Sequence, residues 1–217
     1  RELPGRHLGI MLPASVAASL FYLAALFAGK TPVMVNWTTG ARNLRHSLDL
    51  LDVRVVVTAG ALLSKLEASG IDLSPIADRF LRAESLAPGV SRRRKLWALL
   101  RAYASWRALR PDEVPEHAVI LFTSGSESLP KAVPLTHANI LTNVRDILDV
   151  VRVEDRDVLV GMLPPFHSFG LTIPTVIPLC TGLRTVYHPN PTEAVLLARV
   201  IETFRVTVMV GTPAFLG

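Results

Sequence analysis

Hydroxyl-bearing residues, a glycine and a lysine are grouped between Thr123 and Lys131, in the segment TSGSESLPK. The apolar run AVILF precedes this segment, and a helix-like sequence follows Thr136. A loop between a strand and a helix can point backbone N–H groups and hydroxyls at a phosphate, while a lysine supplies positive charge. We therefore predict that this loop binds a polyphosphate.

The loop differs from the P-loop of kinases and GTPases, which is written G-x-x-x-x-G-K-[ST]. Read from Gly125, the chain gives G-S-E-S-L-P-K-A, so Pro130 replaces the second glycine and Ala132 replaces the magnesium-binding hydroxyl. The pattern therefore indicates another class of ATP chemistry.

Three motifs, in order, resemble those of the adenylate-forming (AMP-binding) enzymes, which include acyl-CoA synthetases and luciferases. The loop resembles T-S-G-[ST]-[TE]-G-x-P-K-G-V, LPPFHSFG at 163–170 resembles P-[LM]-F-H-x-x-G, and VGTPAFL at 210–216 resembles G-[VT]-P-x-x-[LF]. Within this family, the Ser126-Glu127 pair and FHSFGLT are similar to the acyl-[acyl-carrier-protein] synthetase part of bifunctional 2-acylglycerophosphoethanolamine acyltransferases.

The resemblance implies a ligase that joins a carboxylate to ATP, releases pyrophosphate, and passes the acyl group from the adenylate to a thiol. It implies ATP and Mg²⁺ as cofactors, a long-chain fatty acid as substrate, and acyl-carrier protein or coenzyme A as acceptor. It places the ATP phosphates against Thr123, Ser124, Gly125, Ser126, Glu127, Ser128 and Lys131, with Glu127 ordering the loop or standing near magnesium. It places the acyl-substrate pocket at Phe166, His167, Gly170 and Gly211. For His167, packing within an aromatic loop is the alternative.

The chain departs from the family pattern at Ser128 and Ala132, where the family has glycines. Because glycine permits a positive φ and a close backbone approach, we expect reduced or altered ATP affinity. A non-catalytic relative that acts as a binding or scaffold module is the alternative. The chain opens on Arg1 and has no counterpart of the family's Y-G-x-T-E motif or C-terminal lysine. We expect part of a longer polypeptide, which by itself does not complete adenylation and holds no assigned catalytic residue.

The composition and the rhythm of the chain predict the fold. Of 217 residues, 50% are hydrophobic and 19% are charged, which is typical of a folded domain and excludes a disordered chain. Apolar runs at 7–12, 33–37, 53–59, 118–124, 157–164, 184–189 and 206–213 alternate with helix-length segments at 14–28, 41–51, 61–68, 138–151, 169–180 and 194–204. This predicts an α/β fold, a layered and mostly parallel sheet with helices on both faces. By resemblance it is the N-terminal part of the adenylate-forming large domain.

We expect residues 1–217 to form a partial AMP-binding domain. The first βα units occupy 1–70, a basic helical insertion 71–116, and the phosphate-loop and acyl-site units 117–217. From Arg79 to Arg110 there are nine Arg or Lys residues and one Glu, a net charge of +8; because the whole chain carries +5, the remainder carries −3.

Within the insertion, Leu96, Leu99, Tyr103 and Trp106 recur at helical spacing. This helix could pack on its own domain, dock on an anionic membrane surface through Arg92–Arg110, or bind an acidic protein. Nucleic acid is not expected as a partner, because no recognised nucleic-acid-binding fold accompanies the charge.

Two further segments bear on location. Leu8 to Ala28 is apolar and uncharged, but Pro13 predicts a strand, a turn and a buried helix, with a membrane span as the alternative. The single cysteine, Cys180, excludes an internal disulfide and fits a reducing compartment, and we expect it to be buried. The expected location is cytoplasmic, with the inner face of the cell membrane as the alternative for a docked protein.

Overall fold

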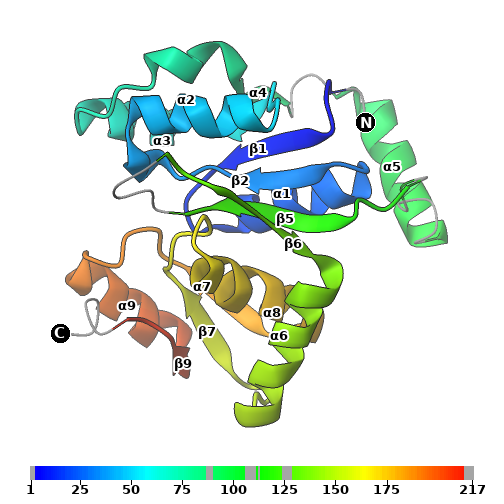
Figure 1. Ribbon diagram of the computed structural model, residues 1–217. Coiled ribbons are helices and arrows are strands. Elements are labelled where there is room, and N and C mark those ends of the chain that lie inside the picture. Colours follow the sequence, from blue (N-terminus) through cyan, green and yellow to red (C-terminus); the bar gives the residue numbers. More distant parts are fainter. Residues whose placement is uncertain (1–2, 87–89, 106–110, 112, 124–128, 213–217) are drawn as a thin grey trace. The chain divides into compact units, whose positions relative to one another are not determined.

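The computed structural model describes residues 3–86, 90–105, 111, 113–123 and 129–212. The chain divides into two compact units (Figure 1). Unit 1 comprises 1–11 and 21–134, and unit 2 comprises 12–20 and 135–217.

Unit 1 contains a sheet with the strand order β4-β3-β1-β2-β5-β6 in the described residues. Strands β4, β3, β1, β2 and β5 run parallel, with Gly9 of β1 opposite Val33 of β2 and Val56 of β3. The strands are β1 (His7–Met11), β2 (Thr31–Met34), β3 (Val56–Thr58), β4 (Phe80–Arg82), β5 (His117–Phe122) and β6 (Ala132–Thr136). The helices associated with this unit are α1 (Val16–Phe27), which continues into unit 2, η1 (Trp37–Thr39), α2 (Ala41–Leu50), α3 (Gly60–Ala68), η2 (Ser74–Arg79), α4 (Ala83–Leu86) and α5 (Arg92–Ala104).

Helices α2 and α3 form the core of unit 1 together with the strands. Leu44 and Leu48 of α2 pack in one buried cluster with Leu63 of α3, Val56 of β3 and Ile120 of β5. These apolar positions follow helical spacing in α2 and α3, so burial of one face fixes each helix against the sheet.

Unit 2 contains a sheet of β8 (Arg184–Tyr187), β7 (Val158–Gly161) and β9 (Val208–Met209), with β7 in the middle and both pairings parallel. Its helices are α6 (His137–Val150), α7 (Ser168–Leu171), the π-helix η4 (Thr172–Val176), α8 (Ile177–Thr181) and α9 (Ala194–Phe204). Thr136 begins α6, where its hydroxyl and the side chain of Asn139 form a reciprocal capping box.

The predicted α/β fold with mostly parallel sheets is therefore confirmed. Segment 71–116 contains a feature that periodicity did not predict, because β4 extends the edge of the unit 1 sheet beside β3. Cys180, predicted to be buried, is exposed near the end of α8. That prediction was wrong because a short helix in an apolar stretch still turns one side outward. Among the described residues, no helix has the length and apolar character needed to cross a membrane.

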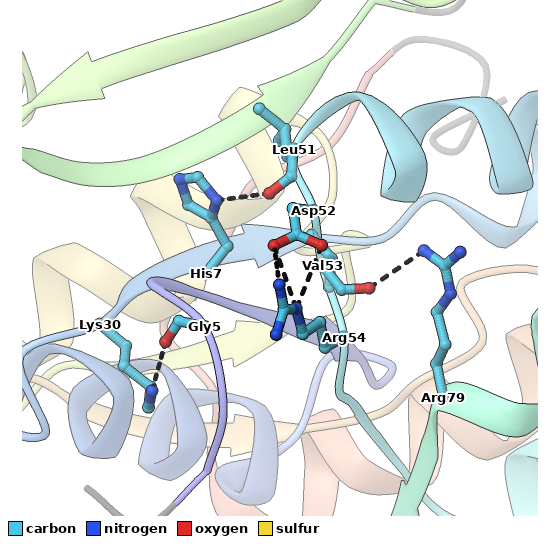
Figure 2. A network of polar contacts seen from close by, with 8 residues as sticks. All are labelled: Gly5, His7, Lys30, Leu51, Asp52, Val53, Arg54 and Arg79. Atoms are coloured by element: carbon cyan, nitrogen blue, oxygen red, sulfur yellow. Dashed lines mark hydrogen bonds and ion pairs between the residues drawn. The ribbon is translucent and has the colours of Figure 1, made fainter.

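Polar contacts tie together the amino-terminal edge of the unit 1 sheet (Figure 2). Lys30, buried just before β2, donates from Nζ to the carbonyl oxygens of Leu3 at 2.7 Å and Gly5 at 2.6 Å. The His7 Nδ1 lies 2.6 Å from the carbonyl oxygen of Leu51. Because a buried ammonium needs partners, these contacts fix the segment that leads into β1.

Arginines at the same edge are also paired within the protein. Arg79 donates to the carbonyl oxygen of Val53 at 3.0 Å (Figure 2). It also donates to the carboxylate of Asp49. The hydrogen bond from Arg79 lowers the pKa of Asp49. Arg54 pairs with Asp52 at 2.9 Å. The two Arg79 contacts join the segment that precedes β4 to the segment that precedes β3, so Arg79 serves the fold.

Candidate functional site

The predicted phosphate loop begins at the carboxyl end of β5, at a neck closed by Thr123 and Lys131. The Thr123 N–H donates to the carbonyl oxygen of Lys131 at 3.1 Å, and the Lys131 N–H donates to Thr123 Oγ1 at 3.0 Å. The Thr123 hydroxyl thus accepts one bond and keeps its hydrogen for another acceptor. Both residues are exposed, and the Lys131 ammonium makes no ion pair within the described chain.

The base of the loop is anchored in the core of unit 1. Pro130 is buried beside Phe122, Asn36 and Leu44, around a void of only about 10 Å³. Proline also fixes its own φ. The neck therefore stands on a tightly packed support, which limits how far Thr123 and Lys131 can move.

Strand register brings a second polar residue to the same edge. Val33 of β2 lies opposite Ile120 of β5 in the parallel pair, so Asn36 and Thr123, each three residues further on, follow the ends of neighbouring strands. Asn36 is buried, and its Oδ1 accepts from the Thr38 N–H at 3.0 Å and the Thr38 hydroxyl at 2.7 Å. Sequence reasoning did not single out Asn36; its position after an apolar run was the available signal. Ligands of open α/β sheets bind at this carboxyl edge.

The remaining predicted phosphate-binding residues, Ser124 to Ser128, lie outside the described residues. They include Glu127, the predicted neighbour of magnesium. Elsewhere in the described ranges, no group of three or more His, Cys, Asp and Glu side chains could hold a metal ion.

The predicted acyl-site motif follows β7 in unit 2. Phe166 is buried, whereas His167 lies at the surface just before α7. Their rings meet edge to face, with centroids 4.7 Å apart and planes inclined by 62°. Partial desolvation by surrounding atoms lowers the pKa of His167. A neutral imidazole next to a phenyl ring suits an uncharged part of a ligand better than a protonated imidazole would.

Gly170 lets the motif fold back on itself. A Cβ at this position would lie 2.0 Å from the carbonyl oxygen of Pro164 and 2.6 Å from its carbonyl carbon. Only a residue without a side chain therefore allows α7 to approach the Pro164-Pro165 segment this closely. The glycine positions His167, which begins α7 and whose carbonyl oxygen accepts from the Leu171 N–H at 2.8 Å.

A π-helix continues directly from α7. Pro178 has no N–H to donate to the carbonyl oxygen of Pro174 one turn earlier, and Tyr187 of β8 donates its hydroxyl to that oxygen at 2.7 Å. The Tyr187 hydroxyl also lies 3.0 Å from Ser19 Oγ. Burial raises the pKa of Tyr187, because ionisation would leave a desolvated phenolate. This side chain joins the π-helix to the sheet.

Because both pairings are parallel, the carboxyl ends of the three strands of unit 2 lie at one edge of the sheet. Val160 of β7 lies opposite Met209 of β9, so Gly211 and Met162, each two residues further on, reach the same level. The predicted pocket residue Gly211 thus shares an edge with the loop that carries Phe166 and His167.

On the other side of β7, His188 follows β8, and sequence reasoning gave it no function. It is buried, and its Nε2 lies 3.2 Å from Glu193 Oε2. Glu193 also accepts from Asn190 Nδ2 at 2.8 Å. An ion pair or hydrogen bond to His188 depends on the proton at Nε2, and either would order the turn that begins α9.

Comparison with known proteins identifies the family and the fold. The profile of the AMP-binding enzymes matches residues 3–217. A medium/long-chain-fatty-acid–CoA ligase, FadD6, of Mycobacterium tuberculosis is 30% identical over 171 residues, which are 78% of this chain and 27% of that protein.

Two solved structures share the fold. The N-terminal domain of FACL13 from Mycobacterium tuberculosis superposes with a TM-score of 0.73 at 22% identity, over 98% of this chain and 51% of that one. The O-succinylbenzoate coenzyme A synthetase MenE of Bacillus subtilis, in complex with ATP and a magnesium ion, gives 0.72 at 17% identity, over 98% and 40%.

The chain therefore spans about half or less of these relatives. Because the family profile covers nearly all of its length, the chain belongs to the AMP-binding enzymes.

Proposed function

We propose that this chain supplies the N-terminal ATP- and acyl-handling portion of a ligase that activates a fatty acid. In this reaction a carboxylate oxygen forms a bond to the α-phosphorus of ATP as the bond to pyrophosphate breaks. A thiolate then attacks the acyl carbon. The bond between this carbon and the phosphate oxygen breaks, which releases AMP. The observation that carries the proposal is the neck of Thr123 and Lys131 at the carboxyl edge of a parallel sheet, in a chain of the AMP-binding family.

The two neck residues have the chemistry that a triphosphate needs. The Thr123 hydroxyl hydrogen is available for a phosphate oxygen, because Oγ1 uses only its acceptor side toward Lys131. The exposed Lys131 ammonium can neutralise phosphate charge. We assign Ser124, Gly125, Ser126, Glu127 and Ser128 to the same role as an extension of this proposal.

Magnesium would shield phosphate charge in this family's chemistry. The described residues hold no group of three metal-binding side chains, and Glu127 lies outside them. We therefore assign no step to the ion.

The loops at the edge of the unit 2 sheet are proposed to line the acyl pocket. Phe166, His167, Gly170 and Gly211 combine an apolar ring, a weakly basic imidazole and two residues without side chains. An aliphatic chain gains by burial against such a surface. The 30% sequence identity to a medium/long-chain-fatty-acid–CoA ligase supports a fatty acid as the substrate.

For the acceptor, we propose coenzyme A or the thiol of acyl-carrier protein. The Ser126-Glu127 and FHSFGLT strings favour an acyl-[acyl-carrier-protein] synthetase, whereas the FadD6 relative is named as a coenzyme A ligase. A direct competition between the two thiols in the second half-reaction distinguishes these acceptors.

The proposal is tested by acid-dependent exchange of pyrophosphate into ATP, using the full-length protein and acids of 2 to 18 carbons. We expect exchange with medium or long acids and a loss of about 10- to 100-fold in Lys131→Ala, because a charged hydrogen bond to the phosphates is removed. Lys65→Ala, on the exposed face of α3, is the matched control and retains exchange.

Absence of exchange with every acid, in a folded full-length protein, would instead support the non-catalytic binding or scaffold module. In that case Ser128→Gly and Ala132→Gly, which restore the family's glycines, show whether these two departures from the family sequence cause the loss of exchange. Recovered exchange would locate the defect in the loop.

A further inference from the structure

Helix α5 (Arg92–Ala104) carries large apolar side chains that nothing in the described chain covers. It has no buried residue. Trp97 is 67% exposed and Tyr103 is 87% exposed, and Leu96, Leu99 and Leu100 are also more than half exposed. Figure 1 shows α5 as a separate helix at the margin of unit 1. The expectation that this helix packs on its own domain is not met within the described residues.

The apolar side chains of α5 share one face, and three of its five cations lie outside that face. With about 100° of rotation per residue, Leu99, Tyr103, Leu96, Leu100 and Trp97 fall within an arc of about 160°. Arg94, Lys95 and Arg101 fall outside this arc, whereas Arg92 and Arg93 fall within it at the first turn of the helix. A helix with a broad apolar face, an arginine- and lysine-bearing polar face, and Trp and Tyr among its apolar residues is typical of peptides that lie in a membrane interface.

The beginning of α5 is strongly electropositive. Four cations, Arg92 to Lys95, occupy the first turn, and no acidic residue is among them. The N-terminal end of a helix already carries a partial positive charge, so these side chains concentrate unfavourable charge at one place. An anionic surface would relieve it. The Ser91 hydroxyl accepts from the Arg94 N–H at 3.3 Å, so the helix begins at a defined cap that holds the four cations together.

Charge selects among the surfaces that could cover this helix. A second copy of α5 carries the same five cations, so two copies of the helix repel each other. An acidic protein would satisfy the cations, but it need not accommodate an apolar arc that extends from Leu96 to Tyr103. An anionic bilayer offers phosphate groups to the arginines and acyl chains to Trp97 and the leucines. It therefore matches both faces at once.

We propose that α5 docks the protein on the surface of a bilayer that contains anionic phospholipid, with the helix lying in the plane of the interface. The apolar arc enters the boundary between headgroups and acyl chains, and the arginine side chains extend to the phosphates. This surface is distinct from the residues assigned to ATP and the acyl group. Its test does not depend on ligase activity.

The experiment is co-sedimentation of the full-length protein with vesicles of phosphatidylcholine alone or of phosphatidylcholine and phosphatidylglycerol at 3:1. We expect at least tenfold tighter binding to the anionic vesicles, and weaker binding as salt is raised, because the attraction is screened. Equal binding to both vesicles, or binding to neither, would overturn the proposal.

Matched variants locate the surface. Arg93→Gln/Arg94→Gln/Lys95→Gln should weaken binding at least tenfold. Arg145→Gln/Arg152→Gln/Arg199→Gln, which removes three exposed arginines from unit 2, should leave it within twofold. Trp97→Ser/Leu100→Ser should lose the binding that persists at high salt. An equal loss in both arginine variants would overturn the assignment to α5, because it would report only total charge.

Folding is checked separately. All substituted positions are exposed, so circular dichroism and the melting temperature of each variant should match those of the parent protein. Vesicle binding by a folded α5 variant at the level of the parent protein would contradict the proposal.

Discussion

Thr123 and Lys131 hold each other through two hydrogen bonds, the Thr123 N–H to the Lys131 carbonyl oxygen at 3.1 Å and the Lys131 N–H to Thr123 Oγ1 at 3.0 Å. The two ends of the seven-residue segment between them are therefore held next to each other at the edge of the sheet. The Thr123 hydroxyl accepts one of these bonds and can still donate its own hydrogen to a ligand.

This dual role predicts that Thr123→Val lowers pyrophosphate exchange by the full-length protein by about 10- to 100-fold, as loss of one hydrogen bond to a charged group does. Thr123→Ser keeps the hydroxyl and should retain most of the activity. If valine and serine gave the same rate, the hydroxyl would have no part in the reaction.

Gly170 gives a prediction about stability. In Gly170→Ala the added Cβ would lie 2.0 Å from the Pro164 carbonyl oxygen, so α7 must move away from the motif. We expect a loss of about 1–3 kcal/mol, as in other overpacked sites. For a chain of this size, that corresponds to a fall in melting temperature of roughly 2–12 °C.

The control for Gly170 is Gly182→Ala, where φ is +77° but no atom lies within 4 Å of the added Cβ. Gly182→Ala adds the backbone strain of a left-handed residue, about 1–2 kcal/mol, without steric overlap, so it shows whether a loss of stability alone alters the enzyme. Because the overlap at residue 170 displaces α7, Gly170→Ala should also raise the KM for the fatty acid, which Gly182→Ala should not. An unchanged KM for the fatty acid in Gly170→Ala would show that Gly170 has no role in the acyl site.

The spacing of apolar residues predicted those helices and strands that are marked by a contiguous pattern in their own sequence. Helix α9 has the predicted bounds, Ala194–Phe204, and the first strand, predicted at 7–12, is His7–Met11. Each is a contiguous run in which apolar spacing alone selects the element. The order of strands in two separate sheets depends on pairings between distant segments, and local spacing does not encode these.

The features missed from the sequence depend on such distant partners. Asn36 enters the candidate site because β2 pairs with β5, more than 80 residues away in the chain. The π-helix between α7 and α8 contains Pro174, whose carbonyl oxygen is satisfied by Tyr187 of β8. The motifs predict a phosphate loop and an acyl-site loop from residues that are consecutive in the chain. They did not reveal which neighbouring strands support them.

His167 provides a prediction about pH. Its pKa is lowered by desolvation, so we expect its imidazole to titrate below the ordinary value of about 6.5. Histidine-selective NMR of the protein, with the resonance assigned by its loss in His167→Gln, measures this midpoint.

The sign of the linked effect on stability follows from the same shift. Below about pH 6.5 the unfolded chain takes up a proton that folded His167 resists, so the free energy of unfolding decreases as the pH falls, until the native pKa is passed. His167→Gln should lack this component. A midpoint above 6.5 would contradict the environment described for the ring.

Tyr187 gives the last prediction. In Tyr187→Phe the Pro174 carbonyl oxygen loses its donor, and Pro178 has no N–H to replace it. Leaving this group unsatisfied should cost about 1–3 kcal/mol. Tyr103→Phe, at a position 87% exposed, is the matched control and should leave the melting temperature unchanged.

The same substitution should alter stability at alkaline pH. Burial raises the pKa of Tyr187, so above about pH 10 the unfolded chain releases its phenolic proton first, and the free energy of unfolding decreases as the pH rises toward the native pKa. Tyr187→Phe removes this component, and its difference from the parent protein should therefore narrow between pH 9 and pH 11. A constant difference across that range would mean that the pKa of Tyr187 is not raised in the folded protein, which would contradict the partly buried phenol that donates to Pro174.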